Sequence, residues 1–290
     1  MTSSTTRLQA IVFLILTAVL WSSSGLIVKI MDWHPLSILS ARSVIASLLF
    51  LVYLRRFPTR WSRLQIIGAI GYAGAQSLFI MATKLTTAAN AIFLQYTSPI
   101  YIALLGYWLL HERPRRADWI AMPVILAGLA LFFGDHLSLE GLYGNLLAVL
   151  SGVSTAVMML CMRSQKAGVP AYTVLLGNML SAVIGLPFLW RETWTLSYIG
   201  IVVYLGVFQI GFSFLLYSIA IKHVRALEST LILTLEPILN PLWVWVALGE
   251  VPGPFATIGG VVVLGAVAAR AISSAGSMDD DPVSPRAVEP

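Results

Sequence analysis

Two apolar stretches decide how this chain folds: AANAIFLQYTSPIYIALLGYWLL over residues 88–110 and ALESTLILTLEPILNPLWVWVAL over residues 226–248. Markers in and around the first stretch recur 138 positions later, in and around the second. The pairs are Lys84 with Lys222, Pro99 with Pro237, Glu112 with Glu250, Pro114 with Pro252, Ala82 with Ala220 and Leu104 with Leu242. The chain contains only four lysines and seven glutamates, so chance is a poor explanation of this register. The second half is therefore interpreted as a copy of the first.

The composition places the chain in a membrane. Hydrophobic residues make up 58% of the 290 residues, charged residues make up 11%, and the mean hydropathy is +0.85. An ordinary soluble domain carries about 25% charged residues, so no soluble catalytic domain is expected. The net charge of +5 comes from basic residues that fall between apolar runs and build no continuous basic face, which argues against a nucleic-acid partner.

The predicted fold is an all-α integral membrane protein with ten transmembrane helices. A helix needs about 20 apolar residues to cross the hydrocarbon of a bilayer. Ten runs meet this requirement, at approximately residues 8–30, 35–54, 64–83, 88–110, 117–134, 141–162, 171–190, 198–221, 226–248 and 255–272. The connections are short and rich in Pro and Gly, which favours antiparallel neighbouring helices. The tail over residues 273–290 is rich in Ser, Asp and Pro and is predicted to be disordered cytoplasm.

The basic residues predict the orientation, because cytoplasmic connections retain Lys and Arg. Fourteen of the 18 basic residues fall in the N-terminal segment, the even-numbered connections and the C-terminal tail, against three in the odd-numbered connections. Both termini are therefore predicted to be cytoplasmic, in a multi-pass protein of a bacterial-type inner membrane. The first run resumes after the small residues 22–25, so an uncleaved span is predicted rather than a signal peptide.

The repeat acquires a geometry from the number of spans. Each copy contains five predicted spans, an odd number, so the second copy enters the membrane from the opposite side to the first. The predicted units are a first five-helix repeat over residues 1–135, a second inverted repeat over residues 136–272, and the tail. Two inverted halves are typical of secondary transporters, which bind substrate near the midplane between the halves. The alternative is a duplicated scaffold or a membrane enzyme that inherited two copies.

The chain resembles the ten-helix EamA-type exporters of the drug/metabolite transporter (DMT) superfamily. The matching residues are the first-run segment from Trp21 to Lys29, Arg42 in the second run, and the segments 99–112 and 236–250, each running from Pro or Glu-Pro to Glu. The resemblance implies efflux of small metabolites, often amino acids, by a proton-coupled or facilitative route. One branch of the family exports aromatic amino acids. The chain departs from the family at Leu110-His111-Glu112, where Gly often precedes the Glu, and at 150–152, where a tryptophan is common.

Polar residues at helical spacing indicate which faces line a cavity. Tyr72 and Gln76 share one face of the third run, and Gln209 and Ser213 share one face of the eighth. All four are predicted to bind substrate, with a hydrogen-bonded structural seam as the alternative. Trp21 is predicted to join them, because an indole offers both a stacking surface and an N–H donor. In the third run, the glycines form a face suited to close packing: Gly68, Gly71 and Gly74.

Prolines interrupt the fourth and ninth runs. Pro99, Pro237 and Pro241 each remove a backbone donor, and they are predicted to act as gating kinks. The carbonyl groups that Pro99 and Pro237 set free are those of Gln95 and Leu233. A kink that neighbouring groups satisfy, without a role in transport, is the alternative. Polar and aromatic residues around these prolines are predicted to bind substrate, and they are Tyr96, Asn240 and Trp243.

Two charged residues lie well inside predicted spans, away from their ends. Glu236 is the one carboxylate close to the middle of a span, and an ionisable group inside the membrane is a functional candidate by default. It is predicted to carry a coupling proton, and the alternative is a hydrogen bond to the backbone opened by Pro237. Arg42 lies about seven residues inside the second run. It either anchors the fold or attracts a substrate carboxylate.

The remaining sequence carries no sign of catalysis. The four histidines are scattered without metal-ligand spacing, and no G-x-x-x-x-G-K-[ST] phosphate loop is present, so no metal, cofactor or enzymatic activity is expected. The expected partners are a small-molecule substrate, membrane lipid and, for a coupled transporter, protons. The leading interpretation is a secondary transporter that exports small metabolites, above all amino acids including aromatic ones, by alternating access about a midplane cavity, on a facilitative or proton-coupled route. The competing interpretations are a membrane enzyme acting on lipid-like molecules and a channel or lipid scramblase.

Overall fold

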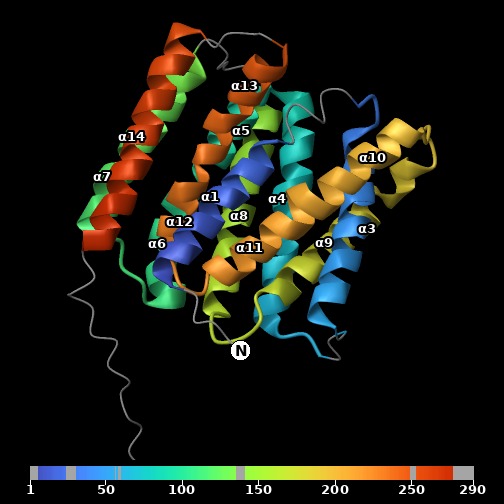
Figure 1. The fold of residues 1–290 in the computed structure, drawn as a ribbon, viewed down its shortest axis with the longest axis horizontal. Helices are drawn as coiled ribbons and strands as arrows, with labels where there is room; N and C mark the ends of the chain where they lie inside the picture. The colour runs from blue at the N-terminus through green and yellow to red at the C-terminus, as the bar shows by residue number, and fades with distance from the viewer. Residues whose placement is uncertain are drawn as a thin grey trace, which may run out of the picture.

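A computed structural model of the chain describes residues 6–23, 31–55, 57, 60–134, 141–248 and 253–276, and within these ranges the secondary-structure elements are all helices, joined by short loops (Figure 1). Helices lie over each of the ten predicted runs. In chain order the elements are α1 (Arg7–Ser22), α3 (Pro35–Leu54), α4 (Arg63–Leu85), α5 (Ala88–Gln95), α6 (Ser98–Leu110), α7 (Arg116–Phe132), α8 (Leu142–Ser164), α9 (Ala171–Leu189), α10 (Leu196–Tyr204), the π-helical segment η2 (Leu205–Phe212), α11 (Ser213–Ala220), α12 (Ala226–Leu233), α13 (Leu235–Leu248) and α14 (Pro254–Gly276).

Five of the described helices are long and apolar enough to cross a membrane. They are α3, α4, α8, α9 and the continuous helix that α10, η2 and α11 form over Leu196–Ala220. The predicted fourth and ninth spans are each divided in two, as α5 with α6 and α12 with α13. The fold is thus all-helical in its described part, as predicted.

Local sequence signals set where several of these helices begin. Ser62 precedes α4 and accepts a hydrogen bond from the backbone N–H of Gln65, whose side chain accepts one from the N–H of Ser62. Thr6 and Gln9 form the same capping box before α1. These contacts satisfy N–H groups that the first turn of a helix leaves without partners.

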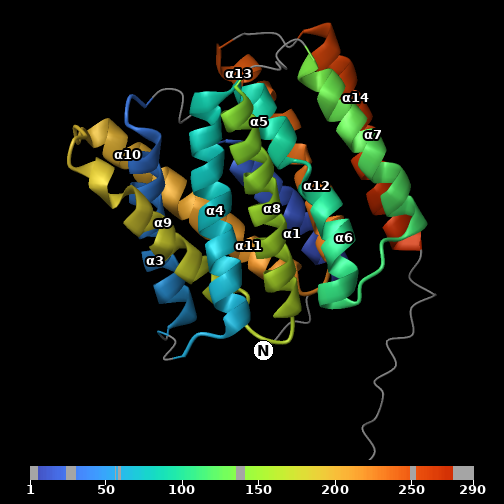
Figure 2. The ribbon, with the colours of Figure 1, turned by 180° about the vertical axis from the view of Figure 1, so that it is seen from behind.

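The two halves of the chain are packed into each other. Helix α4 lies against α8 and α9, α3 lies against α9, and α1 lies against α11, so these contacts join the first half to the second. Figures 1 and 2 show α7 and α14, the last described helix of each half, side by side along one edge of the bundle. The halves therefore share one core.

The glycine face of α4 packs closely against the second half, as the sequence predicted. A Cβ atom at Gly71 would lie 2.9 Å from the backbone nitrogen of Met158 and 2.9 Å from the carbonyl oxygen of Ser154, both on α8. A Cβ atom at Gly68 would lie 2.7 Å from the side chain of Thr173 on α9. Hydrogen side chains thus let the backbone of α4 approach both helices of the second half.

We expect the substitution Gly71→Ala to lower the thermal stability of the protein. Its methyl group would meet backbone atoms, which cannot move aside as a side chain does, and overpacking of this kind costs about 1–3 kcal/mol. The measurement is the apparent melting temperature of the purified protein in detergent. Gly200→Ala on α10 is the control, because nothing lies within 4 Å of a Cβ atom there. Equal melting temperatures for the two variants would contradict the packing argument.

Candidate functional site

A cavity of about 520 Å³ lies between the two halves. Its lining contains residues of α1, α3, α4, α5 and α6 from the first half and of α8, η2, α11, α12 and α13 from the second. Most of the residues that the sequence predicted for the site are part of this lining: Trp21, Tyr72, Gln76, Tyr96, Gln209, Glu236 and Pro237. Arg42 also lines the cavity.

Arg42 is held between two glutamines that come from different halves of the chain. Its Nη1 donates to Oε1 of Gln209 on η2, and its Nη2 donates to Oε1 of Gln76 on α4, both at 3.0 Å. The residue is only 7% exposed, and its Nε is buried without a hydrogen-bond partner. The sequence alone did not predict that Gln76 and Gln209 would meet at one guanidinium.

Glu236 makes the second polar contact across the cavity. Its Oε2 accepts a hydrogen bond of 2.6 Å from the phenol group of Tyr96. The same phenol lies 3.5 Å from the carbonyl oxygen of Leu233, which is one of the two carbonyl groups that the prolines were predicted to free. The side chain of Glu236 therefore contacts a residue of the first half. The same residue, Tyr96, also lies next to the backbone carbonyl group of Leu233.

Tyr96 and Glu236 lie at the two places where a predicted span is divided into two helices. Helix α5 ends at Gln95 and α6 begins at Ser98, while α12 ends at Leu233 and α13 begins at Leu235. At Pro99 and Pro237 the helices are interrupted for two residues and one residue, and each proline occupies the first turn of the helix that follows. Proline is well tolerated there, since the first turn leaves its N–H groups unbonded in any case.

The π-helical segment η2 was not foreseen from the sequence. It covers Leu205–Phe212 and carries Gln209, the residue that binds Arg42. Short π-helical segments are rare and often occur at functional sites. Apolar periodicity in the eighth run gives no signal for this segment, because its residues continue the same apolar pattern as their neighbours.

Two aromatic residues of the lining, Tyr72 and Trp21, form hydrogen bonds with side chains that are not part of the lining. Tyr72 is fully buried and donates its hydroxyl group to Oδ1 of Asn178 at 3.1 Å. Trp21 donates its Nε1–H to Oγ of Ser213 at 2.8 Å, and its ring packs 4.7 Å from that of Phe214. Ser213 thus holds Trp21 in place and is itself outside the lining.

The other predicted site residues lie away from the lining or outside the described part. Trp243 is 38% exposed and donates its Nε1–H to Oγ of Ser22 on α1 at 2.8 Å, so its indole N–H is used in packing rather than toward the cavity. Pro99 is buried in the first turn of α6. The side chains of Asn240 and Pro241 lie outside the described residues. Direct substrate contact by Ser213, Asn240 and Trp243 stays a prediction.

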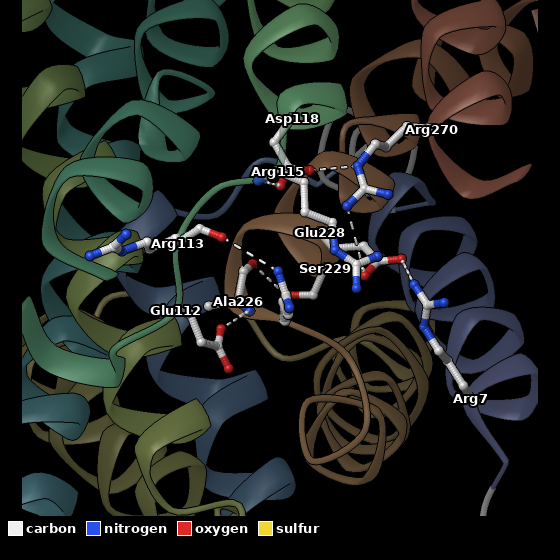
Figure 3. A network of polar contacts seen from close by, with 10 residues as sticks. Arg7, Glu112, Arg113, Arg115, Asp118, Ala226, Glu228, Ser229 and Arg270 are labelled. Atoms are coloured by element: carbon white, nitrogen blue, oxygen red, sulfur yellow. Dashed lines mark hydrogen bonds and ion pairs between the residues drawn. The ribbon is translucent and has the colours of Figure 1, made fainter. Parts of the chain in front are cut away.

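A network of charged side chains lies at one end of the bundle. Glu228 on α12 lies between Arg7 of α1 and Arg270 of α14, with its Oε1 2.6 Å from Arg7 Nη2 and its Oε2 4.0 Å from Arg270 Nη2 (Figure 3). Arg270 also forms an ion pair with Asp118 on α7, and both side chains are almost fully buried. Asp118 in turn accepts a hydrogen bond from the backbone N–H of Arg115. The network joins four helices from both halves.

A second ion pair reinforces the same end. Nε of Arg163, at the end of α8, donates to Oε1 of Glu112 at 2.7 Å. Nη1 of Arg163 donates to the carbonyl oxygens of Ile221 and Lys222. Glu112 also accepts from the backbone N–H of Ala226, where α12 begins and the positive end of the helix dipole favours a carboxylate. Glu250, its counterpart in the predicted repeat, lies outside the described residues.

Sequence reasoning missed the acidic members of the network described above. Asp118 and Glu228 lie in the first turns of α7 and α12, and neither of them was singled out from the sequence. A signal was available in the sequence. Each acid lies at the start of a predicted span, on the side of the membrane where most of the arginines are also predicted to lie. Within the described residues, no group of three or more His, Cys, Asp or Glu side chains could hold a metal ion.

Comparison with known proteins identifies the family. The profile of the EamA-like transporter family matches residues 8–134 and again residues 142–269. The chain belongs to the EamA-like transporter family. Family membership, the duplication and the assignment as a membrane transporter are thus confirmed, while the predicted boundaries of the halves stay a prediction.

Similar proteins carry transporter names. An uncharacterized transporter of Archaeoglobus fulgidus is 22% identical and aligns over 88% of this chain and 94% of its own length. The uncharacterized transporter YwfM of Bacillus subtilis is 26% identical and aligns over 85% of this chain and 88% of its own length. The threonine/homoserine exporter RhtA of Escherichia coli K12 is 24% identical and aligns over 80% of this chain and 79% of its own length. The crystal structure of a protein with 21% sequence identity superimposes with a TM-score of 0.80 and covers 92% of this chain and 98% of its own, which shows that the fold is shared.

Proposed function

We propose that this EamA-like transporter exports small metabolites, with amino acids as the leading substrate class, by alternating access at the cavity between its halves. The cavity itself is the observation that supports the proposal. Its lining combines one cation, Arg42, and one carboxylic acid, Glu236, with aromatic and apolar side chains from both halves. The name of the E. coli relative, a threonine/homoserine exporter, favours amino acids among small metabolites.

The proposed arrangement in the membrane is ten spans in two inverted halves, with both termini in the cytoplasm. The support is that segments predicted to be cytoplasmic meet at one end of the bundle, where Arg7, Glu112, Arg163 and Arg270 take part in ion pairs. Segments predicted to be external meet elsewhere: the backbone N–H of His34 donates to Glu192 at 2.9 Å. Rocking of the two halves would then open and close the charged end.

Radiolabelled amino-acid counterflow into proteoliposomes tests this function. The panel comprises threonine, homoserine and the aromatic amino acids, each with and without a pH gradient. We expect saturable counterflow of at least one of them above the level of protein-free liposomes. Unsaturable flux, scrambling of labelled lipid or conversion of lipid would instead support the channel, scramblase or enzyme interpretation. No counterflow across the panel would refute amino acids as the substrate class.

Glu236 is proposed as the carrier of the coupling proton. We expect Glu236→Gln to keep counterflow at equal pH on both sides and to lose the response to an imposed pH gradient, because an amide cannot exchange a proton. Uptake with and without the gradient is the measurement. Glu192→Gln is the matched control, since its side-chain oxygen can still accept from the N–H of His34. A response to the gradient that survives in Glu236→Gln would remove the proton role.

A further inference from the structure

Arg42 differs from the other buried arginines in what it binds. Three arginines of the described part are buried, namely Arg42, Arg163 and Arg270. Arg163 forms an ion pair with Glu112, and Arg270 forms one with Asp118. The acceptors at Arg42 are two neutral amide oxygens, and among the described residues no carboxylate lies within 4.0 Å of its guanidinium.

A buried cation without an anion is costly. Charges inside a protein or a membrane are normally paired, and when they are not, they mark binding sites and pathways. The two contacts of Arg42 use two of the five N–H donors of its guanidinium. The group is therefore held in place while most of its hydrogen-bonding capacity is unused, and it lines the cavity in that state.

The surroundings of Arg42 select the kind of anion. A guanidinium binds a carboxylate through two parallel hydrogen bonds, which suits its planar fork. The cavity also contains the carboxyl group of Glu236, which is unfavourable to a doubly charged group such as a phosphate monoester. Near Arg42 the walls are apolar, formed by Ile38, Ile210 and Phe214 among others. These features fit a single carboxylate attached to an apolar group.

We infer that the guanidinium of Arg42, oriented by Gln76 and Gln209, is the subsite that binds the carboxylate of the transported substrate. The inference rests on the proposed function in one respect, namely that the cavity is the transport site. It does not require an amino group on the substrate, so monocarboxylates that lack one are also expected to bind. The glutamines are positioning residues. Because Gln76 belongs to the first half and Gln209 to the second, the subsite is complete only when the halves are packed as they are here.

The test compares acids with their methyl esters, which have the same shape and no negative charge. The probes are L-phenylalanine, L-threonine and 3-phenylpropionate, each with its methyl ester, and binding is measured on purified protein in lipid nanodiscs by intrinsic tryptophan fluorescence. We expect at least one acid to bind at least about tenfold tighter than its ester, as a charge-assisted hydrogen bond allows. In Arg42→Gln this ratio is expected to fall to about one. Because both ligands meet the same variant, a change in stability alone does not move the ratio.

A second variant keeps the test valid if Arg42→Gln does not fold. Gln76→Glu places a carboxylate where an amide oxygen already lies 3.0 Å from Nη2 of Arg42. This built-in anion is expected to raise the melting temperature and to abolish the preference for acids over esters. Gln65→Glu on the same helix is the matched control, because a capping box accepts glutamate as well as glutamine.

The outcomes separate the subsite from the proposed function. If no acid binds the wild type, if acid and ester bind alike, or if the ratio survives in Arg42→Gln or Gln76→Glu, the subsite is wrong. If only 3-phenylpropionate shows the preference that depends on Arg42, the subsite stands and amino acids fall as substrates. If amino-acid counterflow occurs, and Arg42→Gln and Gln76→Glu both keep the wild-type ratio of acid affinity to ester affinity, the proposed function stands and the subsite is wrong.

Discussion

The variant Asp118→Ala is expected to unfold at a much lower temperature than the wild-type protein. It removes the carboxylate that pairs with Arg270, whose side chain is only 2% exposed. Removal of one partner of a buried ion pair leaves an uncompensated charge and costs about 3–5 kcal/mol. Glu228, at 4.0 Å from Arg270 and already paired with Arg7, compensates only in part. The measurement is the apparent melting temperature by fluorescence-detected size-exclusion chromatography.

A double-mutant cycle shows whether this loss comes from the pair itself. The double variant Asp118→Ala with Arg270→Ala removes both charges, so its destabilisation is expected to be smaller than the sum of the two single effects. Arg116→Ala, at the exposed start of the same helix α7, is the control and should melt as the wild type does. A single variant Asp118→Ala that also melts as the wild type does would show that the network does not hold this end closed.

The second large effect is expected from an obstacle in the cavity. Thr155 on α8 lines the cavity, and its hydroxyl group donates only within its own helix, to the carbonyl oxygen of Ser151 at 3.0 Å. Thr155→Trp therefore breaks no side-chain hydrogen bond between helices of the described part and places an indole in the space proposed for substrate. We expect counterflow in proteoliposomes to fall to the level of protein-free liposomes, because substrate and indole compete for one volume.

The control for this obstacle is a tryptophan on the outside of the same helix. Leu146 is 54% exposed, so Leu146→Trp adds the same side chain to α8 where a membrane transporter faces lipid. Both variants should elute as folded protein, and only Thr155→Trp should lose transport. Full counterflow by folded Thr155→Trp would mean that substrate does not pass through the cavity.

The sequence predicted those features that depend on neighbouring residues. Helices lie over the ten apolar runs because length and hydropathy are local properties. The breaks at Gln95 and Leu233 follow from Pro99 and Pro237, since the lack of an N–H group acts on the carbonyl group four residues earlier. Tyr72 and Gln76 line the cavity because their spacing of four residues places them on one face of α4.

The features that the sequence did not predict depend on partners far along the chain. The position of Arg42 in the second run favoured anchoring over attraction of a substrate carboxylate, and only the meeting of Gln76 with Gln209 gives it a structural context. Asp118 and Arg270 are 152 positions apart, and nothing in either local sequence names the other. Trp243 was expected in the cavity because it is aromatic, yet its indole contacts Ser22.

The packing of the halves into each other has a consequence for how the protein is made. The ribosome completes α3 and α4 long before it reaches η2, so Arg42 enters the membrane with Gln76 but without Gln209. Until the second half arrives, the glycine face of α4 likewise lacks α8 and α9. During that interval the first half exposes surfaces whose partners belong to the second half.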